Sequence, residues 1–338
     1  MDDRLSTMKK VLFIVKRFPP SVGGVERHVY SVCKALNKSG YIVHIITSEP
    51  RVGKMTDNSK LIIHYVKDPQ VKYLGILYIW IQFILKIRLF INSDIVHVHD
   101  IMIWVIPIRM ILFWKKFYLT MHGWEGEYPI PLKNIIIKRL SDMISTATIS
   151  VGAYIDKYYG THSDIIMYGA ASNNYSKEIQ KRKEIVYLGR LDKDTGLPIL
   201  LESLKKRISY KCIFVGDGEL RDECLEYGFV TGMVKNPEDY IEKADIVIAS
   251  GYLSIIESLQ QKCFVICFYD NELKKDYYKL SPFSKYITTI RNDYQLQKLL
   301  HGYKRSKYIK VIEEAHQFAS SLTWDRTMNQ YLHLWKER

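Results

Sequence analysis

The stretch RFPPSVGGVERHVYSVCKALNKSGYIVHIIT, residues 17–47, decides the fold of this chain. It follows the apolar run at residues 11–15, which is typical of a buried parallel strand. A Pro-Pro pair ends that strand, and Gly23 and Gly24 are expected to let the backbone turn tightly and approach a ligand. Apolar residues three or four apart then predict a helix that ends near Gly40, before a second strand at residues 43–47.

A glycine turn before a helix N-terminus presents backbone N–H groups to an anion. The G-x-G-x-x-G pattern of dinucleotide-binding domains is absent, so a dinucleotide is not implied. Apolar runs alternate with helical patterns along the rest of the chain. Strands are expected near residues 10–15, 42–47, 61–66, 94–98, 117–120, 144–149, 185–188, 211–215, 228–230, 245–248, 264–267 and 287–289. This alternation predicts an α/β protein with doubly wound parallel sheets, and 338 residues fit two domains.

The composition is that of an ordinary globular protein, with 47% hydrophobic and 25% charged residues. The five cysteines form no CxxC pair or zinc spacing, which favours reduced core thiols in a cytosolic protein. No signal peptide is visible at the N-terminus. The longest apolar segment, Leu74 to Leu85, is shorter than the roughly 20 residues that span a bilayer, so no transmembrane segment is expected.

The net charge of +13 is uneven, with +9 in residues 1–170 and +4 in residues 171–338. Between residues 72 and 139 the basic residues coexist with aromatic residues that we expect to be exposed: Tyr73, Tyr78, Trp80, Phe83, Trp104, Phe113, Trp114 and Phe117. This pattern favours an anionic membrane surface, and the alternative is a core helix over residues 76–85 beside solvated lysines. No nucleic-acid recognition module is recognisable, so no nucleic-acid partner is predicted.

Six further stretches complete a signature along the chain. They are DIVHVHD (94–100), LTMHGWEGEYP (119–129), YLGRLDKDTG (187–196), FVGDGELRDE (214–223), VTGMV (230–234) and ADIVIASGYLSIIESLQQKCFVI (244–266). In this order, after Pro-Pro, Gly-Gly and Glu26, they resemble the landmarks of the retaining GT-B-fold glycosyltransferases of family 4, also called glycosyl transferases group 1. The ending FASSLTWDRTMNQYLHLW resembles the closing helix of that family.

The resemblance implies the GT-B fold, in which two Rossmann-like doubly wound domains face each other across a cleft. Residues 1–165 would form the acceptor domain, 166–183 the interdomain connection, 184–320 the nucleotide-sugar donor domain, and 321–338 a helix that crosses back to the N-terminal domain. The implied reaction is metal-independent transfer, with retention, from a nucleotide-diphosphate sugar, with UDP- or GDP-sugars favoured. No other cofactor is expected.

Arg190 follows an apolar run and Gly189, so it is expected at a strand end, where its planar guanidinium suits a phosphate. In the family the matching arginine binds the donor diphosphate and stabilises the departing nucleotide, which makes Arg190 a candidate catalytic residue. The alternative is a structural salt bridge with a nearby aspartate. The family usually has a lysine where this chain has Thr195, and Lys193 is the candidate substitute.

The second phosphate loop is expected over Gly251, Tyr252, Leu253 and Ser254, and in the family the glutamate that matches Glu257 binds the ribose hydroxyls. The Ser-x-x-Glu spacing is also that of a capping box, which is the alternative interpretation. A second glutamate of the family is Ala249 here, which leaves the donor sugar open.

Two weaker donor-site predictions lie between these loops. Gly216 and Gly218 fit a turn near the nucleotide or an ordinary strand-to-helix corner. The segment that ends at Met233 corresponds to family residues that contact the base through the backbone.

On the N-terminal side, His122 ends a strand and precedes Gly123. The matching His-Gly of the family lies over the reacting sugar and acceptor, so His122 is a second candidate catalytic residue. Gly23, Gly24, Glu26 and Gly123 would form the acceptor and phosphate loops. His97, His99 and Asp100 imitate a metal cluster, and the aspartates of DKD (192–194) a metal-binding DxD, but we interpret both as accidental and predict no metal.

The predicted acceptor is lipid-linked or a polysaccharide or other glycan, met in the cytoplasm at the inner membrane face. The alternatives are a catalytically silent nucleotide-sugar-binding GT-B protein, which Thr195 and Ala249 keep open, and another GT-B activity such as a sugar-nucleotide epimerase or a phosphorylase.

Overall fold

The structure is a computed structural model that describes residues 9–50, 61–71, 74–171, 182–206, 210–234 and 236–337. The chain divides into two compact units, one of Met1–Met167 with Trp324–Arg338 and the other of Tyr168–Thr323. The divisions lie close to the predicted limits at residues 165 and 320. Residues 172–181 of the predicted connection lie outside the described residues, and its two ends belong to strands.

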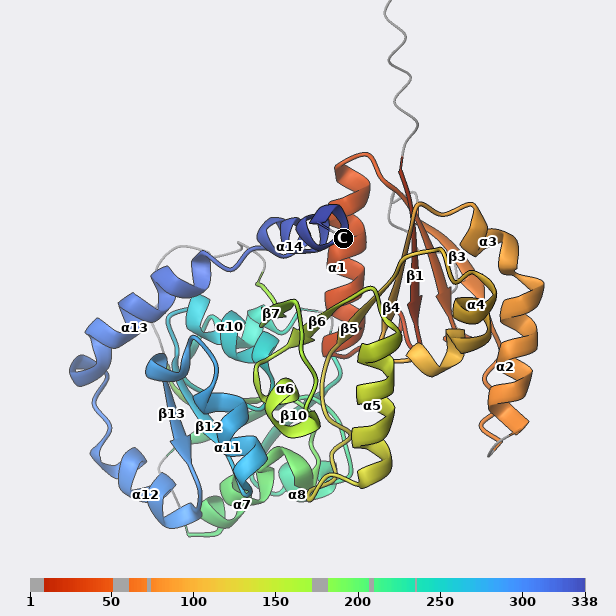
Figure 1. The fold of residues 1–338 in the computed structure, drawn as a ribbon. Helices are drawn as coiled ribbons and strands as arrows, with labels where there is room; N and C mark the ends of the chain where they lie inside the picture. The colour runs from red at the N-terminus through yellow and green to blue at the C-terminus, as the bar shows by residue number, and fades with distance from the viewer. Residues whose placement is uncertain are drawn as a thin grey trace, which may run out of the picture. The chain divides into compact units, whose positions relative to one another are not determined.

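The unit of residues 1–167 and 324–338, called the N-terminal unit, is built on a parallel sheet in the order β3-β2-β1-β4-β5-β6-β7 (Figure 1). Its strands are β1 (Lys10–Val15), β2 (Ile42–Thr47), β3 (Leu61–Tyr65), β4 (Ile95–His99), β5 (Phe117–Met121), β6 (Ala147–Val151) and β7 (Ile165–Met167). Its helices are α1 (Gly24–Lys38), α2 (Leu74–Leu85), α3 (Ile87–Ile91), η1 (Met102–Val105), α4 (Ile106–Ile111), α5 (Leu132–Ile144), α6 (Tyr154–Tyr159) and α14 (Trp324–Glu337). The central strands are buried on both faces, which explains their unbroken apolar runs.

The unit of residues 168–323, called the C-terminal unit, has a similar parallel sheet in the order β10-β9-β8-β11-β12-β13. Its strands are β8 (Arg182–Leu188), β9 (Lys211–Val215), β10 (Gly228–Gly232), β11 (Ala244–Ala249), β12 (Phe264–Phe268) and β13 (Ile287–Ile290). Its helices are η2 (Lys193–Thr195), α7 (Leu197–Lys205), α8 (Arg221–Leu225), α9 (Glu238–Ile241), α10 (Tyr252–Gln260), α11 (Glu272–Lys279), η3 (Ser284–Tyr286), α12 (Asp293–Gly302) and α13 (Arg305–Ser320). Two Rossmann-like sheets confirm the predicted fold class.

In each sheet the strand order reverses beside the first strand, between β1 and β4 and between β8 and β11. Open parallel sheets bind ligands beyond the carboxyl ends of their strands at such a point. The loops after these four strands are therefore the positions that the fold provides for ligands.

One strand boundary and two whole elements differ from the sequence predictions. Strand β6 begins at Ala147, later than expected, because helix α5 continues to Ile144. The predicted elements do not include edge strand β7, which has only three residues, or helix α11, in which charged residues outnumber apolar ones.

The C-terminal helix α14 returns to the N-terminal unit, as predicted, and packs against α1 (Figure 1). Its buried side chains Tyr331 and Trp335 contact the ring of Phe13 on β1. The helix thus completes the core over the centre of the sheet.

Helix α2 is not the core helix that the alternative interpretation required, because most of its apolar side chains are exposed. Helices α2, α4 and α5 and the turn after α4 all expose apolar side chains, which we call the apolar face: Leu77, Ile81, Leu85, Met110, Phe113, Trp114, Ile136, Leu140 and Met143. Three aromatic residues expected to be exposed are instead buried: Phe83, Trp104 and Phe117. Trp80 is half-buried and donates a hydrogen bond from Nε1 to the Ile103 carbonyl, and Tyr73 lies outside the described residues.

In the described part of the chain, no helix is both long and apolar enough to cross a membrane.

Candidate functional site

The predicted site residues fall into two groups, one in each unit. In the C-terminal unit, Leu188 at the end of β8 pairs with Ala249 at the end of β11. The loops that begin at Gly189 and Ser250 therefore emerge side by side. Gly189 has a φ of +153°, and a Cβ there would overlap the Ser250 hydroxyl, so this close approach requires glycine.

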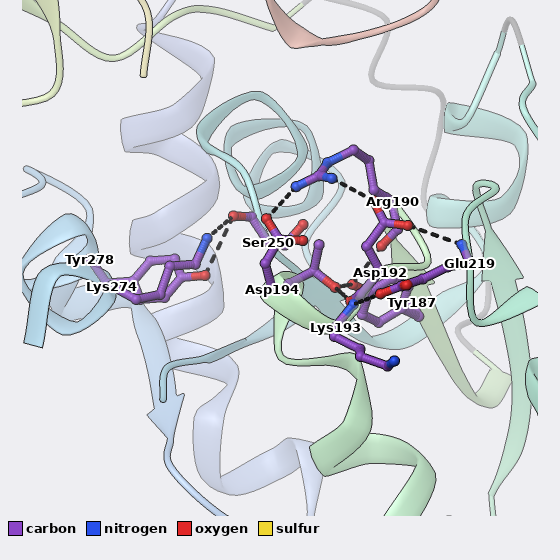
Figure 2. Close-up of polar contacts among 10 residues, drawn as sticks. Tyr187, Arg190, Asp192, Lys193, Asp194, Glu219, Ser250, Lys274 and Tyr278 are labelled. Atoms are coloured by element: carbon purple, nitrogen blue, oxygen red, sulfur yellow. Dashed lines mark hydrogen bonds and ion pairs between the residues drawn. The ribbon is translucent and has the colours of Figure 1, made fainter. Parts of the chain in front are cut away.

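Arg190 extends from the first loop with most of its side chain exposed, and two carboxylates hold its guanidinium (Figure 2). One Nη atom contacts Asp192, and the other lies 2.6 Å from Oδ2 of Asp194. The salt bridge considered as an alternative role is thus present with both aspartates. It fixes the planar fork at the strand end without burying it, which leaves the guanidinium accessible to a phosphate.

Thr195, which stands where a lysine is usual in the resembling family, has a structural role. Its buried hydroxyl accepts a hydrogen bond from Tyr187 at 2.6 Å and donates one to the Asp192 carbonyl at 2.6 Å. Lys193, its candidate substitute, donates its backbone N–H to Glu219, and its side chain points away from Arg190 (Figure 2).

The glycine corner after β9 packs directly on the Arg190 loop. Gly216 has a φ of +155°, and a Cβ there would overlap the carbonyl oxygen of Gly189. A Cβ on Gly218 would overlap the Leu191 carbonyl. Both glycines are therefore required by backbone packing at the predicted nucleotide turn. Met233, after β10, is half-exposed.

The second predicted loop forms the N-terminus of α10. Its backbone N–H groups are partly engaged: Gly251 donates to the Ser254 hydroxyl at 3.3 Å, and Tyr252 donates to the Tyr277 hydroxyl at 3.0 Å. Leu253 N–H lies in the same first turn, where an α-helix provides no backbone acceptor. Glu257 lies one turn further along and is buried, not at the exposed start of the helix.

Lys274, on α11, is a residue that the sequence reasoning did not identify. It is 7% exposed, and its Nζ donates to the Ser250 carbonyl at 2.9 Å (Figure 2). The Tyr278 hydroxyl reaches the same carbonyl at 3.4 Å. Burial lowers the pKa of Lys274 to about 8, although Cys267 and Asp194 favour the charged form.

In the N-terminal unit, Gly23 caps α1 with an extended backbone, so the turn itself does not need glycine. A Cβ on Gly23 would instead overlap the carboxylate of Glu26, which is buried against it. A Cβ on Gly24 would meet no atom within 4 Å, so packing does not require glycine at that position. Neither glycine forms a left-handed turn, and of the two only Gly23 is closely approached by another group.

His122, after β5, belongs to a cluster of histidines. Its Nε2 lies 2.9 Å from Nδ1 of His99, and its ring packs edge-on against His28 at a centroid distance of 4.9 Å. Burial, with the nearby Lys138 ammonium, lowers the pKa of His122 to about 3. His122 is therefore neutral at physiological pH and can act through hydrogen bonds but not as a cation.

His97 and His99, which imitate a metal cluster in sequence, bond within the protein. His97 pairs with the Thr120 hydroxyl at 2.7 Å and with Nε1 of Trp335 at 3.0 Å. Burial lowers the pKa of both histidines, as it does for His28.

The loop after β5 is fixed by charged residues. The backbone N–H of His122 donates to Asp100 at 2.8 Å, and Lys138 donates to the Gly123 carbonyl. Lys138 also lies 3.4 Å from Glu125. These contacts hold His122 and Gly123 at the carboxyl edge of the sheet, where they were expected.

Comparison with known proteins places this geometry in context. Residues 22–167, nearly the whole first segment of the N-terminal unit, match the family model of Glycosyltransferase Family 4. No curated protein matches the sequence significantly.

Solved structures resemble the chain over nearly its whole length. HepE from Anabaena, in complex with UDP and glucose, has a TM-score of 0.77 at 13% identity, over 96% of this chain and 98% of that one. A glycosyltransferase from Rickettsia africae has a TM-score of 0.71 at 17% identity, over 98% of each chain. WaaG, a glycosyltransferase involved in lipopolysaccharide biosynthesis, has a TM-score of 0.64 at 14% identity, over 95% of this chain and 98% of that one. At these identities the likeness shows the fold, which is GT-B.

Proposed function

We propose that this chain, a glycosyltransferase of the GT-B fold, moves a sugar from a nucleoside-diphosphate sugar to a lipid-linked or polysaccharide acceptor with retention at the anomeric carbon. The observation that carries the proposal is the meeting of Arg190 with the N-terminus of α10 at the point where the strand order of the C-terminal sheet reverses. A guanidinium and a helix N-terminus both stabilise negative charge on a departing diphosphate.

The donor is bound without a metal in this proposal. The aspartates of the DKD segment are the residues that imitate a metal ligand pair. Asp192 and Asp194 each contact Arg190, and Asp192 also accepts the backbone N–H of Glu219 at 3.1 Å. Their oxygens thus serve to hold the arginine, which supports direct binding of the diphosphate by protein donors.

The acceptor side is assigned to the N-terminal unit. The neutral ring of His122 offers hydrogen-bonding atoms suited to sugar hydroxyls. No pair of carboxylates of the glycosidase kind was recognised in the sequence. The departing phosphate can accept the proton of the acceptor hydroxyl, which is compatible with retention and needs no separate base.

The donor nucleotide is proposed to be UDP. HepE, which shares the fold, was crystallised with UDP and glucose and with UDP-glucose. GDP is the second candidate, because the residues expected near the base, such as Met233, are expected to contact it through the backbone and not through a base-specific side chain.

The acceptor is proposed to be presented by an anionic membrane, at its cytoplasmic face. The apolar face exposes 73% of Phe113 and 67% of Trp114, an amount of aromatic surface that membrane interfaces accommodate. Arg109 ties this turn to the end of α5, since it donates to the carbonyls of Phe113 and Ile144. Exposed basic residues lie near these side chains in sequence, among them Arg88, Lys116 and Lys133.

A catalytically silent nucleotide-sugar-binding protein is the second candidate. It is favoured by Thr195, whose hydroxyl is committed to internal hydrogen bonds, and by Ala249, which is buried at the end of β11. Neither residue can contribute the charge that the resembling family usually has there.

The experiment is a panel of UDP-, GDP-, ADP- and TDP-sugars, scored for protection against heat and for nucleotide release with and without lipid-linked acceptors. Protection by one nucleotide with release of that nucleotide supports the transferase. Protection without release under any condition supports the silent binder, and no protection by any nucleotide contradicts both.

A further inference from the structure

We propose that Lys274, on helix α11, supplies the positive charge for the donor diphosphate that the Arg190 motif itself lacks. The inference rests on the proposed function, since it names a further residue of the same donor site. It concerns a nucleoside diphosphate as ligand.

The position of Lys274 provides the first argument. Its ammonium lies 2.9 Å from the carbonyl of Ser250, the residue that joins β11 to the start of α10. That carbonyl precedes the N–H groups that the helix presents to a ligand. The lysine therefore contacts the start of the phosphate loop, and Lys274 and Arg190 lie on opposite sides of Ser250 (Figure 2).

The partners of Lys274 provide the second argument. Within the described residues no carboxylate forms an ion pair with it. Its other close neighbours are the rings of Tyr277 and Tyr278, 4.7 and 5.3 Å from Nζ. A buried ammonium without an ion-pair partner is costly, and burial accordingly lowers its pKa to about 8. An anionic ligand at the loop would satisfy this charge.

The formal charge of the loop provides the third argument. Arg190 carries one positive charge, but Asp192 and Asp194 together carry two negative charges. This group alone would repel a diphosphate. Lys274 neutralises it, and Asp194 is one of the charges that raise the pKa of Lys274, so the two groups interact electrostatically.

The test compares wild type, Lys274→Met and Lys274→Arg for binding of UDP and of uridine by calorimetry, or the nucleotide that the panel selects and its nucleoside. Lys274→Met is expected to weaken UDP binding about 10- to 100-fold and to leave uridine binding within about 2-fold, because only the diphosphate needs the charge. Lys274→Arg restores most of the UDP affinity. The matched control is Lys275→Met, which removes the next lysine of α11, a half-exposed residue that pairs with Glu272.

A second measurement does not depend on any variant. The wild-type affinity for UDP is expected to fall as pH rises through about 8, because Lys274 then loses its proton. The charged and titratable groups that face Lys274 are Asp194, Arg190, Asp270, Cys267 and the two tyrosines. Uridine binding should stay constant over the same range.

Three outcomes overturn the inference. Equal loss of UDP and uridine affinity in Lys274→Met would show a structural role only, and unchanged UDP affinity would show no role. A pH-independent wild-type affinity between 7 and 9 would also contradict it. Failure of the wild type to bind any nucleotide overturns the proposed function itself and so differs from these three.

Discussion

The hydroxyl of Tyr331 lies 2.9 Å from Nε2 of His28, a residue 303 positions earlier in the chain. The same hydroxyl lies 3.1 Å from that of Thr120, so one side chain of α14 joins α1 to strand β5. The C-terminal helix is therefore part of the N-terminal core and is bonded to it through buried polar groups. Buried polar groups are costly to leave unpaired, which makes this contact a good test of the architecture.

Tyr331→Phe should destabilise the N-terminal unit by about 1–3 kcal/mol, because His28 and Thr120 each lose a buried partner. The melting temperature of the purified protein measures this. Lys336→Ala, an exposed change on the same helix, is the control and should melt as wild type does. A Tyr331→Phe protein that melts with the control would show that the hydroxyl contributes nothing.

Arg190→Ala should lower the transfer rate about 10²- to 10³-fold, because one preorganised charge is lost from the leaving group. The fold should be unchanged, since the side chain is 61% exposed and surface ion pairs contribute little to stability. Initial rates at saturating donor measure the loss of activity, and circular dichroism measures whether the fold is unchanged. Lys205→Ala, which removes an exposed ion pair with Glu202, is the control. Wild-type activity in Arg190→Ala would remove Arg190 from the site.

The N-terminal unit should lose stability as pH falls below about 6.5. Burial lowers the folded-state pKa of His28, His97, His99 and His122, so the unfolded state binds more protons between about pH 6.5 and the lower folded values. Each histidine contributes up to about 1.4 kcal/mol per pH unit in that window, and the contribution is fully present above pH 6.5.

Melting temperatures at pH 7.5, 6.5, 5.5 and 4.5 measure this dependence. His28→Gln should reduce its slope, while the same change at the exposed His162 should not. A melting temperature that stays constant from pH 7.5 to 4.5 would contradict the assignment of neutral buried histidines.

Gly216→Ala should weaken both the stability of the C-terminal unit and nucleotide binding, because the new methyl group overlaps the Gly189 carbonyl. The positive φ of Gly216 adds backbone strain. Gly302→Ala is the control: open space surrounds that helical glycine, so alanine should be neutral or stabilise by about 0.5–1 kcal/mol. Thermal melts with and without UDP report both effects, and equal behaviour of the two variants would refute the packing argument.

Replacing Phe113 and Trp114 together by serine should abolish binding to vesicles that contain anionic lipid, since these side chains are the most exposed aromatic pair of the apolar face. Sedimentation with phosphatidylglycerol-containing and with neutral vesicles measures this. Phe229→Ser, an exposed aromatic residue of the C-terminal unit, is the control and should bind as wild type does. Equal binding of wild type to both kinds of vesicle would argue against an anionic surface.

The sequence by itself determined the two sheets and the positions of the ligand loops. Unbroken apolar runs such as Val11–Val15 form central parallel strands because both faces of those strands are buried, a property that local composition records. The glycines at 189 and 216 were recognisable because a strand end followed by glycine marks a close approach of the backbone. Local patterns carry such information because they depend on neighbours in the chain.

Only the tertiary structure decided which polar side chains act together. Lys274 and Lys275 are adjacent in sequence, yet Lys274 is buried against the Ser250 carbonyl and Lys275 is half-exposed, because helix α11 turns a single face to the sheet. His28 and His97 gain Tyr331 and Trp335 as partners only when α14 returns to the N-terminal unit. Their pKa values and partners depend on burial, which arises from contacts between residues far apart in the chain, and no local pattern encodes such contacts.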